Sequence, residues 1–313
     1  MDDFFSRVDS RTPLPDLLKH VAERFELGTV NHYEPILTGY QECNIDLTTT
    51  NGRYVVKIFS KEKTKLRIDD IIWGYMHLKK DIPLPVIKPT KDGHHVLEIP
   101  GPSYLCVFDY FEGKPLTQTP ITDADLSSLT LSLSSLHKNP KTIDHYYDTM
   151  GIVNVAREYA LKKDALFPDE QSLIEPVITK LQRIKLSSFR QSIIHGSMEK
   201  ENVLKNSAGE LCILDLGCMD YNASILDIAT FIANFTVYLN EEKRKNFTEL
   251  ILTTYQQSHP LTRDELTALP TLIRAQYVAY IIVMTHKMRK LHDMTKQTQT
   301  WLDRGWGGLK KSL

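Results

Sequence analysis

The chain has few cysteines, and they form no recognisable pattern. The four residues are Cys43, Cys106, Cys212 and Cys218. None of their spacings is the CxxC of metal and redox sites. Three lie in apolar, strand-like segments, where cysteine usually acts as a small core residue. A disulfide-stabilised secreted fold is therefore not expected, and the compartment indicated is a reducing cytoplasm.

Two further absences limit the partners of the protein. The formal net charge is −1, so no strong field of one sign would attract nucleic acid or an anionic membrane. No apolar run approaches the ~18 residues of a membrane span. The first residues, "MDDFFSRVDS", are acidic and do not resemble a signal peptide. We therefore expect a cytoplasmic protein with neither a nucleic-acid nor a membrane partner; composition does not indicate the oligomeric state.

The first third of the 313 residues predicts a small antiparallel sheet. An amphipathic helix begins near residue 13, and the segment 32–60 then has the pattern strand, turn, strand, turn, strand. Asn51-Gly52 is a strong hairpin signal within it. A helix is expected at 64–80, where "DIPLP" stops it, and two more strands in "VIKPTKDGHHVLEI" and "SYLCVFDYF".

The rest of the chain is mainly helical. Helices are expected near 123–137, 151–163, 169–185, 224–238, 241–258 and 262–292, with one short β interruption at 193–216. The tail "TWLDRGWGGLKKSL" has no clear assignment. The predicted organisation is α+β: an amino lobe at 1–111, with a helix and a nucleotide-binding sheet, and a helical carboxyl lobe at 112–313.

Three polar residues stand out as candidates for chemistry. Lys57 lies in the strand "YVVKIF"; taken alone, it favours an edge-strand lysine whose amine reaches solvent. Asn202 and, thirteen residues later, Asp215 flank a strand–turn–strand hairpin behind a His-Gly pair. Either residue alone is most simply a turn or cap. Together they supply hard oxygen ligands of the kind that magnesium prefers.

These motifs, in this order, resemble the aminoglycoside phosphotransferase and choline kinase-like family. The likeness spans roughly 30–235 and is most specific in "HGSMEKEN" and "LDLG", where the family has HGDxxxxN and I-D-[FLW]-[GE]. The segments "IPLP", "YFEGKPL" and "LHKNP" also match family positions. The resemblance implies a two-lobed protein-kinase-like fold, with ATP or GTP and Mg²⁺ as cofactors and a small-molecule hydroxyl as phosphoryl acceptor.

Carried over by position, the resemblance assigns a role to each candidate. Lys57 would contact the nucleotide phosphates, under a loop that contains Gly39. The backbone of 108–111, including Asp109 and Phe111, would bind adenine. Asn202 and Asp215 would hold magnesium, and His195 and Asp227 would support the catalytic loop.

One departure from the family concerns the partner of Lys57. The following helix usually carries a glutamate that pairs with this lysine, but "RIDDIIWGYMHL" has none. Asp70 stands at about the right distance from "IPLP" and is the candidate. Its shorter side chain would require a closer helix or a bridging water.

The second departure is Ser197, which stands where the family has its catalytic aspartate. A serine does not accept the acceptor's proton at neutral pH without a base of its own. Glu199 and Glu201 follow on the same loop, and either carboxylate is a candidate substitute; the simpler interpretation makes them solvated loop charges. Asp220 could attract an amine-bearing acceptor, or serve as a turn residue.

Two functions fit this pattern. One is a small-molecule kinase acting on an aminoglycoside, homoserine or a choline-like amino alcohol. The alternative is a nucleotide-binding pseudokinase or regulatory protein with little phosphoryl transfer. Transfer of a nucleotidyl group would need the nucleotide reversed, and no residue argues for that chemistry.

Overall fold

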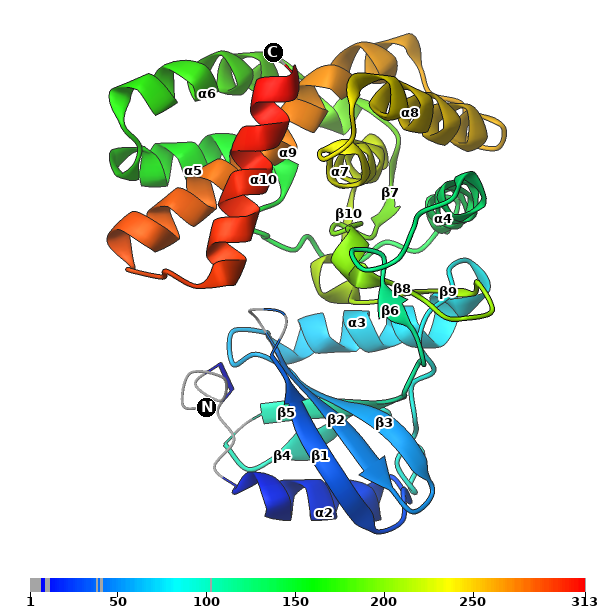
Figure 1. The fold of residues 1–313 in the computed structure, drawn as a ribbon. Coiled ribbons are helices and arrows are strands. Elements are labelled where there is room, and N and C mark those ends of the chain that lie inside the picture. Colours follow the sequence, from blue (N-terminus) through cyan, green and yellow to red (C-terminus); the bar gives the residue numbers. More distant parts are fainter. Residues whose placement is uncertain (1–6, 9–11, 38, 40–41, 102, 313) are drawn as a thin grey trace. The chain divides into compact units, whose positions relative to one another are not determined.

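The structure, a computed structural model, describes residues 7–8, 12–37, 39, 42–101 and 103–312 (Figure 1). The chain divides into two compact units. Unit 1 contains Met1–Lys114 and Leu204–Leu214, and unit 2 contains Pro115–Val203 and Asp215–Leu313.

A five-stranded antiparallel sheet forms the centre of unit 1. Its strands are β1 (Val30–Ile36), β2 (Cys43–Thr49), β3 (Gly52–Ile58), β4 (Leu97–Ile99) and β5 (Ser103–Asp109), in the order β1-β2-β3-β5-β4. The expected Asn51-Gly52 hairpin joins β2 to β3, with Thr49 opposite Gly52. Only Leu97–Ile99 of the segment 86–99 becomes a strand; Pro89, earlier in the segment, lacks the N–H that a ladder needs.

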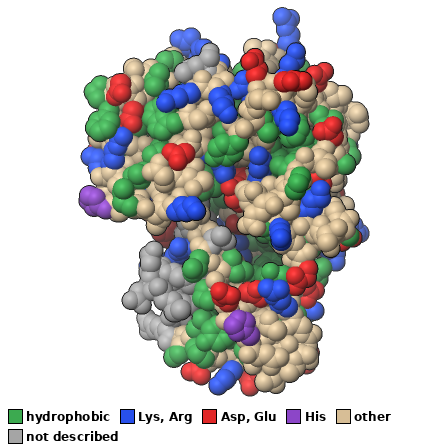
Figure 2. Space-filling view, in the orientation of Figure 1, with side chains coloured by type: hydrophobic (Ala, Val, Ile, Leu, Met, Phe, Trp, Pro, Cys, Tyr) green, Lys and Arg blue, Asp and Glu red, His purple; other side chains and the backbone are tan. Residues whose placement is uncertain are grey.

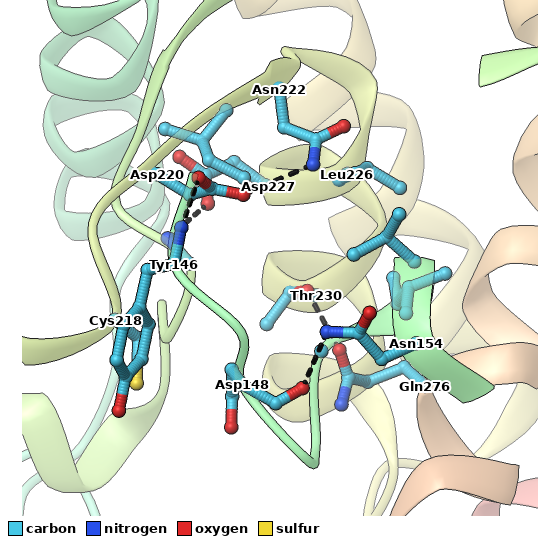
Figure 3. Close-up of a pocket in the computed structure, with 15 residues that line it drawn as sticks. Tyr146, Asp148, Asn154, Cys218, Asp220, Asn222, Leu226, Asp227, Thr230 and Gln276 are labelled. Atoms are coloured by element: carbon cyan, nitrogen blue, oxygen red, sulfur yellow. Dashed lines mark hydrogen bonds between the residues drawn. The ribbon is translucent and has the colours of Figure 1, made fainter. Parts of the chain in front are cut away.

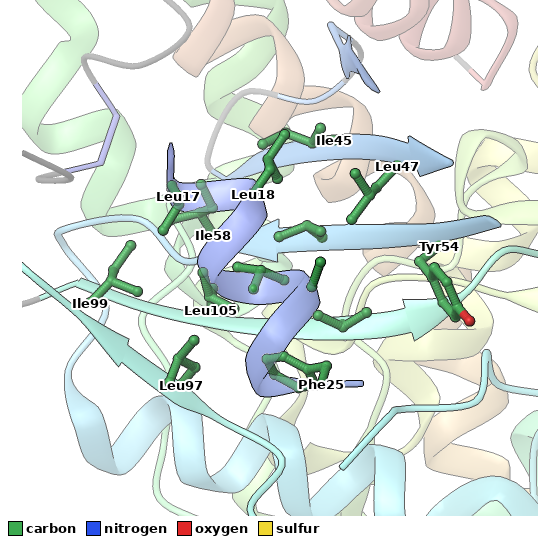
Figure 4. Close-up of a cluster of buried hydrophobic side chains, with 14 of the residues drawn as sticks. Leu17, Leu18, Phe25, Ile45, Leu47, Tyr54, Ile58, Leu97, Ile99 and Leu105 are labelled. Carbon is green, nitrogen blue, oxygen red and sulfur yellow. The ribbon is translucent and has the colours of Figure 1, made fainter. Parts of the chain in front are cut away.

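Helices α2 (Leu14–Arg24) and α3 (Lys65–His77) lie on opposite faces of this sheet (Figure 1). Leu18 and Val21 of α2 are fully buried against Ile45 and Leu105 of the sheet (Figure 4). Burial of such side chains stabilises the folded state by roughly 1.5–3 kcal/mol each. On the other face, the ring of Tyr75 in α3 packs 4.6 Å from that of Phe108.

Unit 2 is built from helices, as the sequence predicts. They are α4 (Asp123–Leu136), α5 (Val155–Lys162), α6 (Pro168–Gln182), α7 (Ile225–Thr236), α8 (Glu241–Gln256), α9 (Arg263–Lys290) and α10 (Lys296–Ser312). Capping boxes begin α4, at Thr122 and Asp125, and α9, at Thr262 and Glu265. The tail, for which the sequence patterns indicate no clear structure, forms helix α10.

Helix α9 is long and apolar enough to cross a membrane by length and composition, but 67% of its apolar window is buried inside the structure. It packs against α5, α6, α7 and α10 and is thus the core helix of unit 2. Helix α10 approaches α9 closely because Gly305 and Gly308 face it. A Cβ on Gly308 would lie 2.3 Å from the Tyr277 ring.

The segment between α6 and α7 contains short strands. Strands β7 (Gln191–Ile194) and β10 (Asp220–Ala223) pair antiparallel, with Asp220 opposite Ile194. Strands β8 (Val203–Lys205) and β9 (Leu211–Ile213) are neighbours in a three-stranded sheet with β6 (Lys114–Pro115). A tight turn at Asn206–Glu210 joins β8 to β9. On the face drawn in Figure 2, basic and acidic side chains are interspersed.

Candidate active site

Lys57 is buried in the middle of the unit 1 sheet. Strand β3 lies between β2 and β5, so the edge-strand interpretation of this lysine is wrong. Its Nζ lies 3.5 Å from Oε2 of Glu42, and Nζ of Lys63 lies 3.1 Å from Oε1 of the same carboxylate. The three side chains are at most 7% exposed. Two buried ammonium groups therefore lie against the same carboxylate.

Three other residues expected at the nucleotide are Gly39, Asp109 and Phe111. Gly39 has φ +94°, a left-handed conformation that favours glycine, and its carbonyl accepts a hydrogen bond from Arg7 (2.9 Å). Asp109 ends β5; its N–H donates to the carbonyl of Val86, and its carboxylate lies 3.5 Å from Lys88 Nζ. Phe111 packs close to the backbone of Gly113.

The loop that follows β7 is fixed at its start by Asp227. This fully buried carboxylate of α7 accepts the backbone N–H groups of His195 (2.6 Å) and Gly196 (2.8 Å). Its Oδ2 also lies 3.0 Å from Nε2 of His137. Burial alone would raise the pKa of Asp227, but the contacts with His137 and His195 outweigh it and lower that pKa. Asp227 therefore supports the loop, as the resemblance implies.

Gly196 allows the loop to pass close to the segment after Asp215. It has φ +80°, and a Cβ there would lie 2.2 Å from the carbonyl oxygen of Cys218. Any other residue would strain the backbone and push the two segments apart.

Ser197 and Asn202 lie in contact across this loop. The side-chain amide of Asn202 donates to the carbonyl oxygen of Ser197 (3.0 Å) and to its Oγ (3.4 Å). A carbonyl oxygen only accepts, so Nδ2 of Asn202 faces Ser197 and Oδ1 faces away from it. On the other side, the N–H of Ser197 donates to Nδ1 of buried His195 (3.3 Å), and its Oγ lies 3.4 Å from the same nitrogen.

Asp215 has a strained backbone. Its φ of 62° and ψ of 81° are left-handed, and its Oδ1 accepts the N–H of Gly217 (3.0 Å). A non-glycine residue in this region costs of order 1–3 kcal/mol and is typical of functional sites. Asn202 precedes β8 and Asp215 follows β9, so the two residues stand at the same end of the hairpin. Their oxygen donors fit a magnesium ion, with waters completing its shell.

Glu199 and Glu201 are held by the helices of unit 2. Glu199 is 9% exposed and accepts a hydrogen bond from the hydroxyl of Tyr280 in α9 (3.2 Å). Burial raises the pKa of Glu199 to about 8, although Arg304 lowers it. Glu201 is bound by the guanidinium of Arg304 in α10, whose Nη1 also donates to Asn234 (3.0 Å). The expectation of solvated loop charges is thus wrong for Glu199, and Glu201 is ion-paired.

A small crevice with a cavity volume of about 30 Å³, open to solvent, lies beside the start of this loop (Figure 3). Its wall includes Gly196 of the loop and residues of α7 and α9. In Figure 3, Asp220 and Asn222 lie at one end of the drawn group and Asp148 and Asn154 at the other. Asp220 is a strand residue rather than a turn residue. Its carboxylate accepts hydrogen bonds from His145, from the N–H of Tyr146 (2.9 Å) and from Asn222 (3.0 Å).

Two residues were missed by the sequence patterns: Glu42, the acidic partner of Lys57, and Arg304, which pairs with Glu201 of the loop. Glu42 immediately precedes β2, outside the helix where the resemblance places a glutamate. Asp70, half-buried on α3, stays a predicted contributor. Arg304 lies 103 residues from Glu201 in a segment with no assignment. The one available signal for it was an arginine flanked by tryptophans and glycines in the tail.

The chain is similar to known phosphotransferases along most of its length. A sequence profile of the Phosphotransferase enzyme family matches residues 32–266. The homoserine kinase of Bartonella henselae is 21% identical over 275 residues, covering 86% of this chain and 85% of that protein. The homoserine kinase of Bradyrhizobium sp. (strain ORS 278) is 23% identical over 288 residues, covering 85% and 83%.

Solved structures share the fold at lower identity. The choline kinase LicA from Streptococcus pneumoniae has a TM-score of 0.68 at 17% identity, covering 95% of this chain and 99% of that one. A spectinomycin phosphotransferase with ADP and spectinomycin has a TM-score of 0.72 at 11% identity, covering 97% and 100%. An amicoumacin kinase in complex with AMP-PNP, Ca²⁺ and Ami has a TM-score of 0.67 at 15% identity, covering 96% of this chain and 94% of that one.

Fold and family together define a kinase of small molecules that phosphorylates a hydroxyl group, and they confirm the α+β kinase-like fold expected from the sequence. The chain belongs to the Phosphotransferase enzyme family.

Proposed function

We propose that the chain is an ATP- and magnesium-dependent kinase whose acceptor is the hydroxyl of a small amine-bearing alcohol. The observation that carries the proposal is the arrangement around Asn202 and Asp215. Asn202 is oriented by Ser197 so that Oδ1 faces away from the loop, and Asp215 holds a strained backbone at the same end of the hairpin. Magnesium bound there would neutralise charge on the transferred phosphoryl group.

The other expected nucleotide contacts follow from unit 1. Lys57, held by Glu42 beside Lys63, would bind the phosphates, with Asp70 as a further acid near it. The loop containing Gly39 would cover the phosphates, and the backbone from Asp109 to Phe111 would bind the base. Adenine nucleotides named with two of the similar structures support ATP rather than GTP, and the Ca²⁺ of one supports a divalent metal.

The proposed reaction is a direct phosphoryl transfer. The acceptor oxygen forms a bond to the γ-phosphorus, the bond from that phosphorus to the β–γ bridging oxygen breaks, ADP leaves, and the hydroxyl proton passes to water or a nearby base. Ser197 replaces the expected aspartate, so general-base help worth about 10²–10⁴-fold in rate is reduced. Glu199 and Glu201 stay candidate bases, but their contacts with Tyr280 and Arg304 favour a structural role.

The crevice beside Gly196 is the proposed acceptor site, because it borders the loop and α7 as a carboxyl-lobe acceptor pocket should. The names of the sequence relatives support an amino alcohol such as homoserine. Such an enzyme would act in the cytoplasm, where ATP is available. The alternative is a nucleotide-binding pseudokinase, which the serine at position 197 favours.

The test is ATP turnover by the full chain with magnesium and a panel of acceptors: homoserine, choline, aminopropanol, a sugar and an aminoglycoside. Acceptor-dependent release of ADP supports the kinase. Tight, magnesium-dependent ATP binding without turnover on any acceptor would support the pseudokinase instead.

A further inference from the structure

The hydroxyl of Ser197 lies between the proposed metal ligand Asn202 and the ring of His195. Its Oγ is 3.4 Å from Nδ2 of Asn202 and 3.4 Å from Nδ1 of His195. Ser197 is half-buried, so a ligand can reach it, whereas His195 is fully buried and would act on a ligand only through another group. Both contacts are long for hydrogen bonds, as is common for catalytic groups before a substrate binds and tightens them.

The imidazole nitrogen that faces Ser197 is a base. The backbone N–H of Ser197 donates to Nδ1 of His195 (3.3 Å). Because an N–H group only donates, Nδ1 is the unprotonated nitrogen of the ring. The ring can therefore accept a proton at the atom that lies next to the serine hydroxyl.

The hydrogen of the Ser197 hydroxyl has a defined direction. Nδ2 of Asn202 donates to the carbonyl oxygen of Ser197 (3.0 Å) and to its Oγ, so Oγ accepts on that side. Of the two groups that the described residues place against Oγ, only Nδ1 of His195 can take its hydrogen. A hydroxyl oxygen accepts twice, so Oγ keeps one position for a donor such as the hydroxyl of a phosphoryl acceptor.

Asp227 supplies a fixed negative charge beside His195. Its buried carboxylate accepts the backbone N–H of His195 (2.6 Å). Burial would raise the pKa of Asp227, but its contacts with His137 and His195 lower it, so the group is ionised at neutral pH. A positive charge that forms on the His195 ring would be stabilised by this carboxylate, because opposite charges attract strongly in a buried site.

We propose that Ser197 and His195 form a proton relay, in which the acceptor's hydroxyl binds to Oγ of Ser197 and His195 is the base behind it. As the acceptor oxygen bonds to the γ-phosphorus and the bond to the β–γ bridging oxygen breaks, the acceptor's proton passes to Oγ and the proton of Oγ passes to Nδ1. ADP leaves, and the imidazolium returns its proton to solvent through Ser197. This inference rests on the proposed kinase function and assigns its proton acceptor.

Ser197→Ala separates the relay from support of the loop, because it keeps the carbonyl oxygen that orients Asn202 and removes only the hydroxyl. For the full chain with MgATP and the acceptor that it uses best, kcat should fall at least about tenfold, with the KM values for ATP and magnesium unchanged. Ser207→Ala, in an exposed turn, is the matched control and should behave like the native chain. An unchanged kcat in Ser197→Ala would overturn the inference.

The role of His195 is tested in two backgrounds. Ser197→Asp supplies its own carboxylate base, so it should make the imidazole dispensable as a proton acceptor. His195→Gln should lower kcat at least about tenfold in the native background and less than about threefold beside Ser197→Asp, with urea unfolding as the check on folding. Equal losses in the two backgrounds would show that His195 only supports the loop, and would overturn the inference.

A further measurement needs neither turnover nor a folded His195 variant. Nitrogen-15 NMR of the native chain at neutral pH should show that Nδ1 of His195 is unprotonated. A proton on Nδ1 would overturn the inference, because the ring could not accept a second proton at that atom.

Failure of the kinase proposal has a different signature. If no acceptor stimulates ADP release by either the native chain or Ser197→Asp, the kinase proposal fails and the relay fails with it. If Ser197→Asp is active and the native chain is not, the kinase site is present and the relay is overturned.

Discussion

Arg304 of α10 binds Glu201, the residue immediately before the proposed metal ligand Asn202. The guanidinium side chain is 5% exposed, bridges Glu201 and Asn234, and lies 4.3 Å from the centre of the Trp301 ring. Burial would lower the pKa of Arg304, but the carboxylate of Glu201 holds it above its ordinary value. The last helix of the chain therefore fixes the end of the loop that presents Asn202.

Arg304→Met should loosen this end of the loop. Removing one partner leaves Glu201 unpaired, and because that carboxylate is 38% exposed we expect a loss of about 1–3 kcal/mol rather than the larger cost of a fully buried pair. The KM for magnesium should rise more than the KM for ATP. Arg304→Lys, which keeps the charge, should recover part of both effects; equal losses in the two variants would contradict a role for charge.

Glu199 should make stability depend on pH. Its folded-state pKa, about 8, lies above the ordinary 4.5, so the folded protein holds a proton that the unfolded chain releases. The contribution of Glu199 to the free energy of unfolding is fully present below about pH 4.5. It is lost as the pH rises toward 8, at no more than about 1.4 kcal/mol per pH unit.

Glu199→Gln keeps an acceptor for Tyr280 but has no titrating proton. The free energy of unfolding in urea, measured from pH 5 to 8, should fall less steeply for this variant than for the native chain. Burial lowers the pKa of His259 to about 4, so this residue makes the free energy of unfolding rise with pH. The native chain and the variant share this effect, and it cancels when their curves are subtracted. Parallel curves would contradict a buried, protonated Glu199.

Glu42 should matter for nucleotide binding through Lys57. Glu42→Gln keeps the size of the side chain but removes the charge that two buried lysines share. We expect the KM for ATP to rise about tenfold or more, with a smaller change in acceptor KM, because the ammonium of Lys57 loses its fixed position. Glu62→Gln, at an exposed neighbouring position, serves as the control and should behave like the native chain.

The sequence predicts the position of Lys57 but not that of its partner Glu42, and this contrast shows what local sequence signals can predict. Asn51-Gly52, alternating apolar residues and an order of motifs placed Lys57 in its strand, and the same local signals located the hairpin from Asn202 to Asp215. Glu42 escaped prediction because its pairing depends on how β2 approaches β3, which sequence spacing does not specify.

The tail was harder still to predict. Three glycines lower the helix propensity of α10, so the segment lacks a clear helical signal. In the folded chain, Gly305 and Gly308 allow α10 to approach α9, and this packing brings Arg304 to a loop 103 residues away. Long-range packing also explains why Glu199 is buried although its local sequence is charged.

Ser197→Asp should raise kcat if the serine is the weak point of the site. The new carboxylate could accept the acceptor's proton, and such help is worth about 10²–10⁴-fold in rate. Ser197→Asn provides a side chain of the same shape without a base and should give no increase. An equal or lower kcat in Ser197→Asp, with ATP binding unchanged, would show that proton acceptance does not limit the native enzyme.

The central claim is that Asn202 and Asp215 bind the magnesium of the nucleotide, and Asp215→Ala tests it most directly. Calorimetry would measure the affinity of the full chain for ATP with magnesium and with EDTA. We predict that the native chain binds ATP more tightly with magnesium and that Asp215→Ala abolishes this difference while remaining folded. An unchanged magnesium dependence in the variant would contradict the account.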